Sequence, residues 1–336
     1  MSKLKTLIVG FGAVARGLAM DTKMSNWFPI ATHAQALQAD NRFDWVGVVD
    51  PDPAAQKSAK QDWNISAFGS VEEAAHLEPD ILILAAPPGE RAAVLRALTS
   101  VKGVFAEKPL GDDDGKALVK EAEQRNLPLQ VNYWRRGDRT LGILASGGIR
   151  ERVGDIQAAT GVYGNGLANN GSHLIDMIRM LLGEPVWAQA IGDITPASGG
   201  PITGDIHVAF ALGMPTGTVV SIHPLDFRHY REVALDIWGT VGRIALQQET
   251  LDIRIMPRVA NRGLDDEYEI AADESVELKS TVADTLPNLY ANLADAVTTR
   301  TPLLSPGKSA LKTENIINLV HRSANTGNSR LMIGDA

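Results

Sequence analysis

Short apolar runs alternate with helix-like segments along the first 131 residues. The apolar runs lie at residues 6–9, 43–49, 81–85, 101–106 and 127–131. Helical patterns lie between them, for example at residues 72–76 and 90–100. Buried strands that alternate with helices are typical of a parallel sheet covered on both faces. The pattern therefore predicts a doubly wound α/β domain over residues 1–131.

After residue 131 the pattern changes to strands that follow one another directly. Period-two runs lie at residues 156–163, 186–191, 206–212, 218–223, 232–238, 243–247 and 251–256. Successive strands with short connections predict an antiparallel sheet. Helices are expected at residues 138–146, 173–182, 286–299 and 308–323. Residues 132–336 therefore form an α+β domain with a large open antiparallel sheet, and its last helix can pack back on the first domain.

The first apolar run leads into a glycine-rich turn, TLIVGFGAVARG, at residues 6–17. Gly10, Gly12 and Ala15 occupy the three small positions of G-x-G-x-x-G/A, in which a tight turn brings backbone N–H groups to a pyrophosphate. A helix is expected from Ala13 to Met20, with its N-terminus towards the phosphates. The expected cofactor contacts are the backbones of Gly10, Gly12, Ala13 and Val14. The turn predicts a Rossmann dinucleotide site; a tight turn without a ligand is the alternative.

The second strand ends in Asp50, which Pro51 follows. A carboxylate at this position accepts hydrogen bonds from both ribose hydroxyls of an adenosine, and it repels a 2′-phosphate. The sequence therefore favours NAD over NADP. An Asp-Pro pair that only begins a turn is the alternative. Between this strand and the glycine turn, Pro29 is expected to interrupt an additional loop or helix in residues 20–41.

The composition excludes several classes of protein. The net charge of −8 argues against a nucleic-acid partner. The chain has no cysteine, which excludes disulfides and thiolate chemistry and fits a cytoplasmic protein. Its first residues lack the pattern of a signal peptide, and no apolar run approaches the ~18 residues of a membrane span. The Asp112-Asp113-Asp114 run is expected in a solvated loop or in the first turn of a helix.

The fourth apolar run ends abruptly in Glu107-Lys108-Pro109. Ligands of doubly wound sheets lie outside the carboxyl ends of the strands, which is where Lys108 falls. A lysine at the edge of a low-dielectric cleft can donate to a substrate hydroxyl or relay a proton. A surface lysine in a Lys-Pro turn is the alternative. Pro87, after the third strand, is expected beneath the nicotinamide, although a plain loop explains it equally well.

A second candidate group lies in GLANNGSHLIDMIRMLLG, residues 166–183. His173 and Asp176 share one face of a helix that Ser172 or Asn170 is expected to cap. The ordinary pKa of an imidazole suits proton exchange with a reacting hydroxyl. A histidine that only secures the helix start is the alternative. No cluster of residues has the spacing of a metal site, so none is expected.

Together, the glycine turn, EKPLG and GSHLIDMIRMLLGEP resemble the glucose–fructose oxidoreductase/inositol dehydrogenase/MocA (Gfo/Idh/MocA) family, over most of the chain. The resemblance implies a second domain for substrate binding and oligomerisation, with two or four subunits. It also implies that Lys108 is catalytic, that its bond to Pro109 is often cis, that Glu107 and Lys108 contribute to the cofactor site, and that His173 is functional.

One position departs from the family pattern. Many members carry aspartate four residues before the histidine, whereas this chain has Asn169, which can hydrogen-bond a hydroxyl but cannot take a proton. Asn169 is retained as a catalytic candidate, and Asp176 either orients His173 or pairs within its helix. The further substrate-binding candidates are Tyr133, Trp134, Arg136, Asn170 and Asp176. For Tyr133, Trp134 and Arg136, the alternative is a solvated arginine pair, Arg135 and Arg136, at a domain junction.

The resemblance implies an NAD(P)-dependent oxidoreductase that transfers a hydride between nicotinamide and a hydroxyl or keto carbon of a sugar, cyclitol or related molecule. In the oxidative direction, His173 accepts the hydroxyl proton while Lys108 polarises the oxygen. Two other interpretations remain open. One is a glycoside-cleaving enzyme that recycles its bound NAD within each turnover, and the other is a non-catalytic NAD-sensing protein.

Overall fold

The computed structural model describes residues 2–20, 22–197 and 200–334. The chain divides into two compact units. Unit 1 comprises residues 1–137 and 283–311, and unit 2 comprises residues 138–282 and 312–336. The division differs from the expected one, which placed all residues after 131 in one domain. A long segment near the C-terminus belongs to unit 1, and the chain leaves unit 1 again within its last helix.

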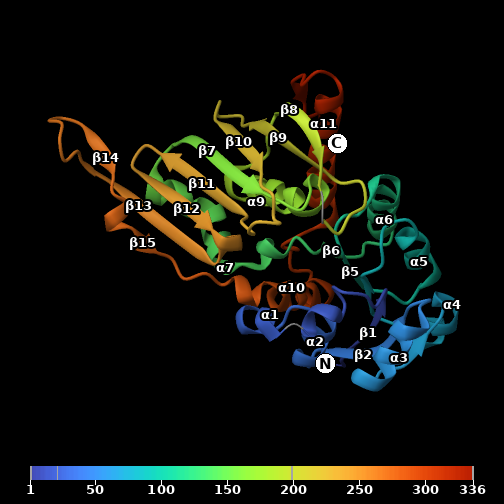
Figure 1. The fold of residues 1–336 in the computed structure, drawn as a ribbon. Helices are drawn as coiled ribbons and strands as arrows, with labels where there is room; N and C mark the ends of the chain where they lie inside the picture. Colours follow the sequence, from blue (N-terminus) through green and yellow to red (C-terminus); the bar gives the residue numbers. More distant parts are fainter. Residues whose placement is uncertain (1, 21, 198–199, 335–336) are drawn as a thin grey trace. The chain divides into compact units, whose positions relative to one another are not determined.

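Unit 1 contains a six-stranded parallel sheet in the order β3-β2-β1-β4-β5-β6 (Figure 1). Its strands are β1 (Leu4–Val9), β2 (Phe43–Val49), β3 (Ala67–Phe68), β4 (Ile81–Leu84), β5 (Gly103–Ala106) and β6 (Leu129–Val131). Its α-helices are α1 (Thr22–Trp27), α2 (His33–Ala39), α3 (Pro53–Asp62), α4 (Val71–Ala74), α5 (Arg91–Ala97), α6 (Asp112–Gln124) and α10 (Thr285–Thr299). Short 3₁₀ turns are η1 (Gly17–Met20), η2 (Ala75–Leu77), η3 (Trp134–Gly137) and η8 (Val282–Asp284), whose first residue lies in unit 2.

Both faces of this sheet are covered, as the continuous apolar strands predicted. Leu82 and Leu84 of β4 pack with α5 and α6, whereas Ile81 and Ile83 pack on the other face. Helix α10 covers that second face with buried leucines and Tyr290. Since side chains alternate along a strand, a strand buried on both faces must be apolar at every position. The parallel sheet of the sequence analysis is confirmed.

The helix expected at residues 13–20 is wrong. Residues 13–16 form a turn, and a 3₁₀ turn follows at Gly17–Met20. The carbonyls of Val14 and Ala15 accept hydrogen bonds from the first N–H groups of α2 instead of continuing a helix. The expected break at Pro29 is confirmed, because α1 ends at Trp27 and α2 begins at His33.

Unit 2 contains a ten-stranded mixed sheet in the order β14-β13-β12-β11-β7-β10-β9-β8-β16, with β15 paired to β13. Its strands are β7 (Ile156–Tyr163), β8 (Trp187–Pro196), β9 (Ile206–Gly213), β10 (Val219–Pro224), β11 (Ala234–Gly239), β12 (Gly242–Gln247), β13 (Asp252–Ala260), β14 (Tyr268–Ile270), β15 (Val276–Glu277) and β16 (Leu331–Met332). Its helical segments are α7 (Arg139–Ile143), η4 (Leu144–Gly148), α8 (Ile149–Val153), η5 (Leu167–Gly171), α9 (Ser172–Leu182), η6 (Gln248–Thr250), η7 (Ala272–Glu274) and most of α11 (Gly307–Asn325).

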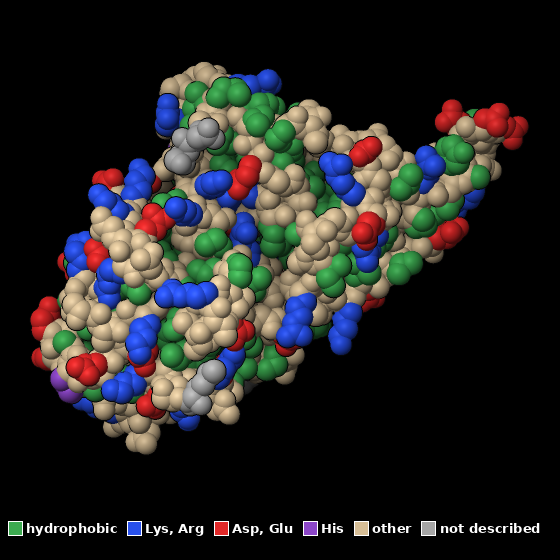
Figure 2. Space-filling model, turned by 180° about the vertical axis from the view of Figure 1, so that it is seen from behind, with side chains coloured by type: hydrophobic (Ala, Val, Ile, Leu, Met, Phe, Trp, Pro, Cys, Tyr) green, Lys and Arg blue, Asp and Glu red, His purple; other side chains and the backbone are tan. Residues whose placement is uncertain are grey.

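The described strand pairs of this sheet are antiparallel except β7 with β10, which run parallel. This exception arises because α9, β8 and β9 intervene between β7 and β10, so these two strands are not joined by a short turn. The hairpin of β13 and β14 extends beyond the rest of the sheet (Figure 1). Its tip carries exposed acidic side chains, visible in Figure 2, at Asp265, Asp266 and Glu267.

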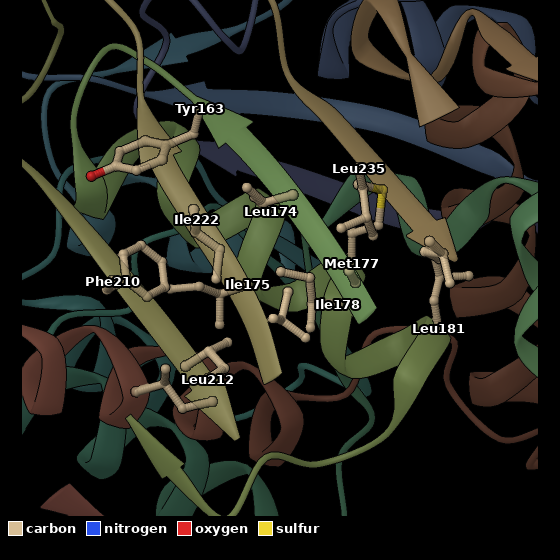
Figure 3. Packing of buried hydrophobic residues seen from close by; sticks show 14 of the residues in the cluster. Tyr163, Leu174, Ile175, Met177, Ile178, Leu181, Phe210, Leu212, Ile222 and Leu235 are labelled. Carbon is tan, nitrogen blue, oxygen red and sulfur yellow. The ribbon is translucent and has the colours of Figure 1, made fainter. Parts of the chain in front are cut away.

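Helix α9 packs its apolar face against one side of the sheet of unit 2 (Figure 3). Leu174, Ile175 and Ile178 meet Phe210 and Ile222 from the strands, and all five are fully buried. The residue before Leu174 on this helix is His173. The position of this candidate residue is therefore set by a packed core. Among the described residues, no helix has the length and apolar character needed to cross a membrane.

Candidate functional site

The glycine turn brings the end of β1 against the chain that follows β4. Gly10 has φ +88°, and a Cβ added there would lie 2.4 Å from the backbone nitrogen of Ala86. The N–H groups of Ala85 and Ala86 both donate to the carbonyl of Val9, at 2.8 and 3.0 Å. Only glycine fits such a close approach in this conformation. Gly10 therefore holds two neighbouring strand ends together.

Gly12 is a glycine for a different reason. A Cβ added there would meet no protein atom within 4 Å. Ala13 and Val14 are exposed beside it, whereas Ala15 is buried at 1% exposure, as a small third residue requires. The protein itself does not demand glycine at position 12. This open, side-chain-free surface fits the backbone approach of a dinucleotide pyrophosphate.

Asp50 joins the end of β2 to this turn. One carboxylate oxygen accepts a hydrogen bond from the N–H of Phe11 at 2.7 Å, and the other accepts from the N–H of Asp52 at 2.9 Å. The second bond is the local turn that the Asp-Pro pair predicted, and the first spans 39 residues. Each carboxylate oxygen accepts more than one hydrogen bond, so the group retains capacity for ribose hydroxyls.

The chain after β4 is held by Arg91, which the sequence analysis missed. Its buried guanidinium donates to the carbonyls of Ala86, Glu107 and Pro109, at 2.5–3.0 Å. The exposed Pro87 lies between Ala86 and Arg91 in sequence. Asp114 accepts from the N–H groups at the start of α5, so the acidic run forms the first turn of α6 and also caps α5. No local signal identifies Arg91, because its partners lie up to 18 residues away.

Lys108 lies two residues beyond the carboxyl end of β5 and is half-buried, and its peptide bond to Pro109 is cis, as the resemblance implied. Glu107 is 7% exposed. Its Oε1 lies 2.6 Å from Asn132 Nδ2 and 2.9 Å from His33 Nε2. Burial alone would raise the pKa of Glu107, but the hydrogen bonds from His33 and Asn132 and the charge of Lys108 outweigh it and hold the pKa below its ordinary value.

The stretch after β6 contributes fewer candidates than expected. Tyr133 is 1% exposed and belongs to the core of unit 1, which argues against stacking on a substrate. Trp134 is half-buried, and the guanidinium of Arg135 lies 4.2 Å from its ring centroid. Arg136 is half-buried. The alternative of a fully solvated arginine pair is wrong, since Arg135 is 2% exposed.

In unit 2, the helix that carries His173 begins earlier than expected. A π-helical turn, η5, leads directly into α9, so neither Ser172 nor Asn170 caps it. The cap comes from Asp205, which is 6% exposed. Its carboxylate accepts hydrogen bonds from the N–H groups of Ala168 and Asn169, each at 3.0 Å.

Gly166 makes this capping contact possible. A Cβ at Gly166 would lie 1.9 Å from Asp205 Oδ2. The N–H of Gly166 donates to His207 Nε2 at 3.0 Å. Asp205, just before β9, and His207, at the start of β9, thus fix the backbone that carries Asn169, Asn170 and His173. The sequence analysis missed Asp205 because it lies 36 residues from Asn169.

Asp176 takes part in a buried ion-pair network of unit 2. Its Oδ1 lies 3.4 Å from Arg179 Nη1 and 3.2 Å from Thr313 Oγ1. Arg179 also forms two hydrogen bonds with Glu184. Asp176 is 2% exposed, which argues against direct contact with a substrate and supports the expected pairing within the helix. His173 and Asn169 are each 9% exposed.

The candidate residues therefore form two groups. In unit 1, the carboxyl ends of the parallel strands bring together Gly10, Gly12, Asp50, Glu107 and Lys108. In unit 2, one helix and the turn before it carry Asn169, Asn170 and His173. The first group has the components of a dinucleotide site, and the second presents an imidazole and two amides.

Comparison with known proteins identifies related sequences. The profile described as "Oxidoreductase family, NAD-binding Rossmann fold" (GFO_IDH_MocA) matches residues 4–133. The profile of the GFO/IDH/MocA C-terminal domain matches residues 152–245. The trans-1,2-dihydrobenzene-1,2-diol dehydrogenase of Oryctolagus cuniculus is 32% identical over 133 residues. That match covers 38% of this chain and 37% of the rabbit protein, so it spans about a third of each.

Solved structures match over the whole chain. The WlbA dehydrogenase from Bordetella pertussis, in complex with NADH and UDP-GlcNAcA, has a TM-score of 0.74 at 20% identity, with 100% of both chains covered. Levoglucosan dehydrogenase, in complex with NADH and levoglucosan, has a TM-score of 0.76 at 16% identity, over 99% of this chain and 100% of that one. At such identities the likeness concerns the fold.

Proposed function

We propose that this chain, which belongs to the Gfo/Idh/MocA family of NAD-binding oxidoreductases, is an NAD-dependent dehydrogenase or reductase of a sugar, cyclitol or related polyhydroxylated molecule. The observation that carries the proposal is the grouping of Gly12, Asp50 and Lys108 at one edge of the parallel sheet. An open glycine surface, a ribose acceptor and an ammonium are the components that a dinucleotide and a reacting hydroxyl require.

Lys108 and His173 divide the proton chemistry. The Lys108 ammonium donates a hydrogen bond to the reacting oxygen and stabilises the negative charge that develops there. The His173 imidazole takes the hydroxyl proton when the substrate is oxidised and returns it in the reverse direction. Asn169 hydrogen-bonds a substrate hydroxyl but exchanges no proton. A dinucleotide whose pyrophosphate lies on the glycine turn would supply, through its nicotinamide, the hydride acceptor or donor.

Substrate recognition is proposed for Asn170, Trp134 and Arg136. Asn170 extends from the same turn as Asn169, and Trp134 and Arg136 follow β6. Amide, indole and guanidinium groups suit a ligand with several hydroxyls, because each pairs a polar contact with a flat surface. The names of the related dehydrogenases, which bind UDP-GlcNAcA or levoglucosan, agree with this class of substrate.

The preference for NAD over NADP is proposed from Asp50. Its carboxylate would repel a 2′-phosphate at the ribose position. Asp50→Ser is expected to weaken NADH binding and to raise the affinity for NADPH relative to NADH by about tenfold or more. The matched control is Asp44→Ser, an exposed position on the same strand. If the ratio of NADPH affinity to NADH affinity were the same in the Asp50 variant and in the wild type, the assignment of Asp50 would be wrong.

The direct test of the function is a panel of polyols, sugars and cyclitols with NAD or NADP, followed at the absorbance of the reduced nicotinamide. We expect turnover with at least one member and with NAD preferred. Glycoside cleavage without added NAD and without net NADH would instead support internal recycling of the cofactor. Tight NADH binding with no turnover of any member would support a non-catalytic sensor.

Self-association is proposed through the face of the large sheet that α9 leaves uncovered. Small half-buried residues lie on this face, among them Thr160, Ala209, Ser221 and Ala234. A flat surface of this kind suits a second copy related by two-fold symmetry. Light scattering after size-exclusion chromatography is expected to give the mass of two or four chains, and a monomer at micromolar concentration would contradict it.

A further inference from the structure

A buried polar cluster lies behind Lys108. Four residues from separate parts of unit 1 form it: His33 at the start of α2, Glu107 after β5, Asn132 after β6 and Tyr290 in α10. Glu107 Oε1 contacts His33 Nε2 at 2.9 Å and Asn132 Nδ2 at 2.6 Å, and His33 Nδ1 lies 2.7 Å from Tyr290 Oη. His33 and Tyr290 are fully buried. Polar groups are costly to bury unless they are paired, so the cluster needs a reason beyond packing.

The hydrogen-bond partners show which atom of each pair carries the proton. Burial and the charge of Glu107 raise the pKa of Tyr290 well above its ordinary value, so its hydroxyl keeps its proton. Within the described residues, that hydroxyl lies within hydrogen-bond distance of His33 Nδ1. A buried hydroxyl must donate, and so Nδ1 accepts. The remaining proton of the ring is then on Nε2, from which it is donated to Glu107.

This arrangement leaves Glu107 as a buried carboxylate next to Lys108. Both His33 Nε2–H and Asn132 Nδ2–H donate to the same oxygen, which favours the ionised form. Charged groups near Glu107 include the adjacent Lys108 ammonium and the Arg91 guanidinium, which donates to the Glu107 carbonyl at 2.5 Å. A negative charge in this position stabilises the ammonium form of Lys108.

The same cluster is joined to the glycine turn. The N–H groups of His33 and Ala34 donate to the carbonyls of Val14 and Ala15, at 3.4 and 3.0 Å. The N–H of Asn132 donates to the carbonyl of Ala106 at 2.9 Å, next to Glu107 in the chain. The geometry therefore couples the segment that carries Lys108 to the turn proposed to hold the dinucleotide.

We propose that Glu107, anchored by His33, Asn132 and Tyr290, is a positioning residue that fixes Lys108 and keeps it as an ammonium, in place of the direct cofactor contact that the sequence analysis expected. This inference rests on the proposed function of Lys108, but it concerns the lysine itself. It can therefore be tested without a substrate. Of the four residues, the sequence analysis assigned a site role only to Glu107.

The test measures the titration of the Lys108 amine by trace acetylation. Wild type and Glu107→Gln receive limiting acetic anhydride at a series of pH values, and mass spectrometry quantifies modification of Lys108. Loss of the carboxylate is expected to lower the pKa of Lys108 by about one unit. Glu274→Gln, an exposed change of the same charge, is expected to leave the titration unchanged. An identical Lys108 titration in wild type and Glu107→Gln would overturn the proposal.

A second pair of variants covers the case in which Glu107→Gln does not fold. His33→Gln retains an N–H donor towards Glu107 and is expected to keep the wild-type titration of Lys108. His33→Leu removes the donor, so the carboxylate loses its stabilisation and the Lys108 amine becomes more reactive near neutral pH. Equal reactivity in the two His33 variants would also overturn the proposal. Absence of dehydrogenase activity with a shifted titration would reject the proposed function while the positioning role stands.

Discussion

The carboxylate of Asp205 accepts a hydrogen bond from the backbone N–H of Asn169 at 3.0 Å, across 36 residues of sequence. The same carboxylate binds the N–H of Ala168, and both bonds secure the turn that leads into the helix of His173. A catalytic imidazole must be held within a fraction of an ångström of its productive position. Asp205, just before β9 in unit 2, therefore holds the turn that leads to the proposed catalytic imidazole.

Asp205→Asn is expected to lower both stability and activity. The amide offers one acceptor oxygen and places an N–H group against backbone donors, so at least one charge-assisted bond is lost. We expect the free energy of unfolding to fall by about 1.5–3 kcal/mol, measured by urea denaturation. Asp193→Asn, at an exposed position of β8, is the matched control and is expected to unfold like the wild type. Equal midpoints for the two variants would show that Asp205 does not hold the turn.

Substitution by alanine is expected to have different effects at Gly10 and at Gly12. Gly10→Ala forces a Cβ within 2.4 Å of the Ala86 backbone at φ +88°, so backbone strain alone is expected to cost about 1–3 kcal/mol of stability. Gly12→Ala meets no protein atom and is expected to fold normally. It is nevertheless expected to weaken NADH binding about tenfold or more, because the Cβ would occupy the surface proposed for the pyrophosphate. Calorimetric titration with NADH and thermal unfolding separate the two effects, and unchanged NADH affinity in Gly12→Ala would argue against this surface.

Acidification is expected to loosen the same turn in unit 2 through His207. Burial lowers the pKa of His207, and the charges of Asp205 and Asp226 oppose this shift without cancelling it. The unfolded chain therefore binds the proton more tightly, and the stability that His207 contributes above its ordinary pKa of about 6.5 is lost as the pH falls below it. A protonated ring also cannot accept the hydrogen bond of Gly166.

Thermal unfolding between pH 5 and pH 8 checks this expectation. His207→Gln is expected to show a shallower loss of stability on the acid side than the wild type. Part of the slope is expected to remain, because burial also lowers the pKa of His321. His229→Gln, whose side chain is 77% exposed, is expected to retain the wild-type slope. If His207→Gln lost stability with falling pH as steeply as the wild type, His207 would not be the cause of the acid sensitivity.

Local patterns in the sequence predicted the strands and the glycine turn well. The continuous apolar runs of β4 and β5 indicate burial on both faces, and Gly10 and Gly12 lie directly after a strand. Local reasoning failed where a distant partner decides the conformation. The helix expected after Gly12 is replaced by turns because α2 takes the carbonyls of Val14 and Ala15.

The same limit applies to the site. Lys108 and His173 were recognisable from motifs, whereas their supports were not. His33 pairs with Glu107 over 74 residues and with Tyr290 over 257 residues, and single-sequence patterns carry no signal for such pairs. Ser172 and Asn170 looked like helix caps because their side chains favour that role. Their helix instead begins at η5, where Asp205 provides the cap.

The most direct measurement compares the rate of hydride transfer in Lys108→Ala with that in Lys102→Ala, using the substrate found in the panel and saturating NAD. Lys102 is an exposed lysine paired with Asp80 at 2.7 Å just before the same strand. The account predicts that Lys108→Ala slows single-turnover formation of NADH by about 10²–10⁴-fold, while Lys102→Ala matches the wild type. Single-turnover rates in Lys108→Ala equal to those of the wild type would contradict it.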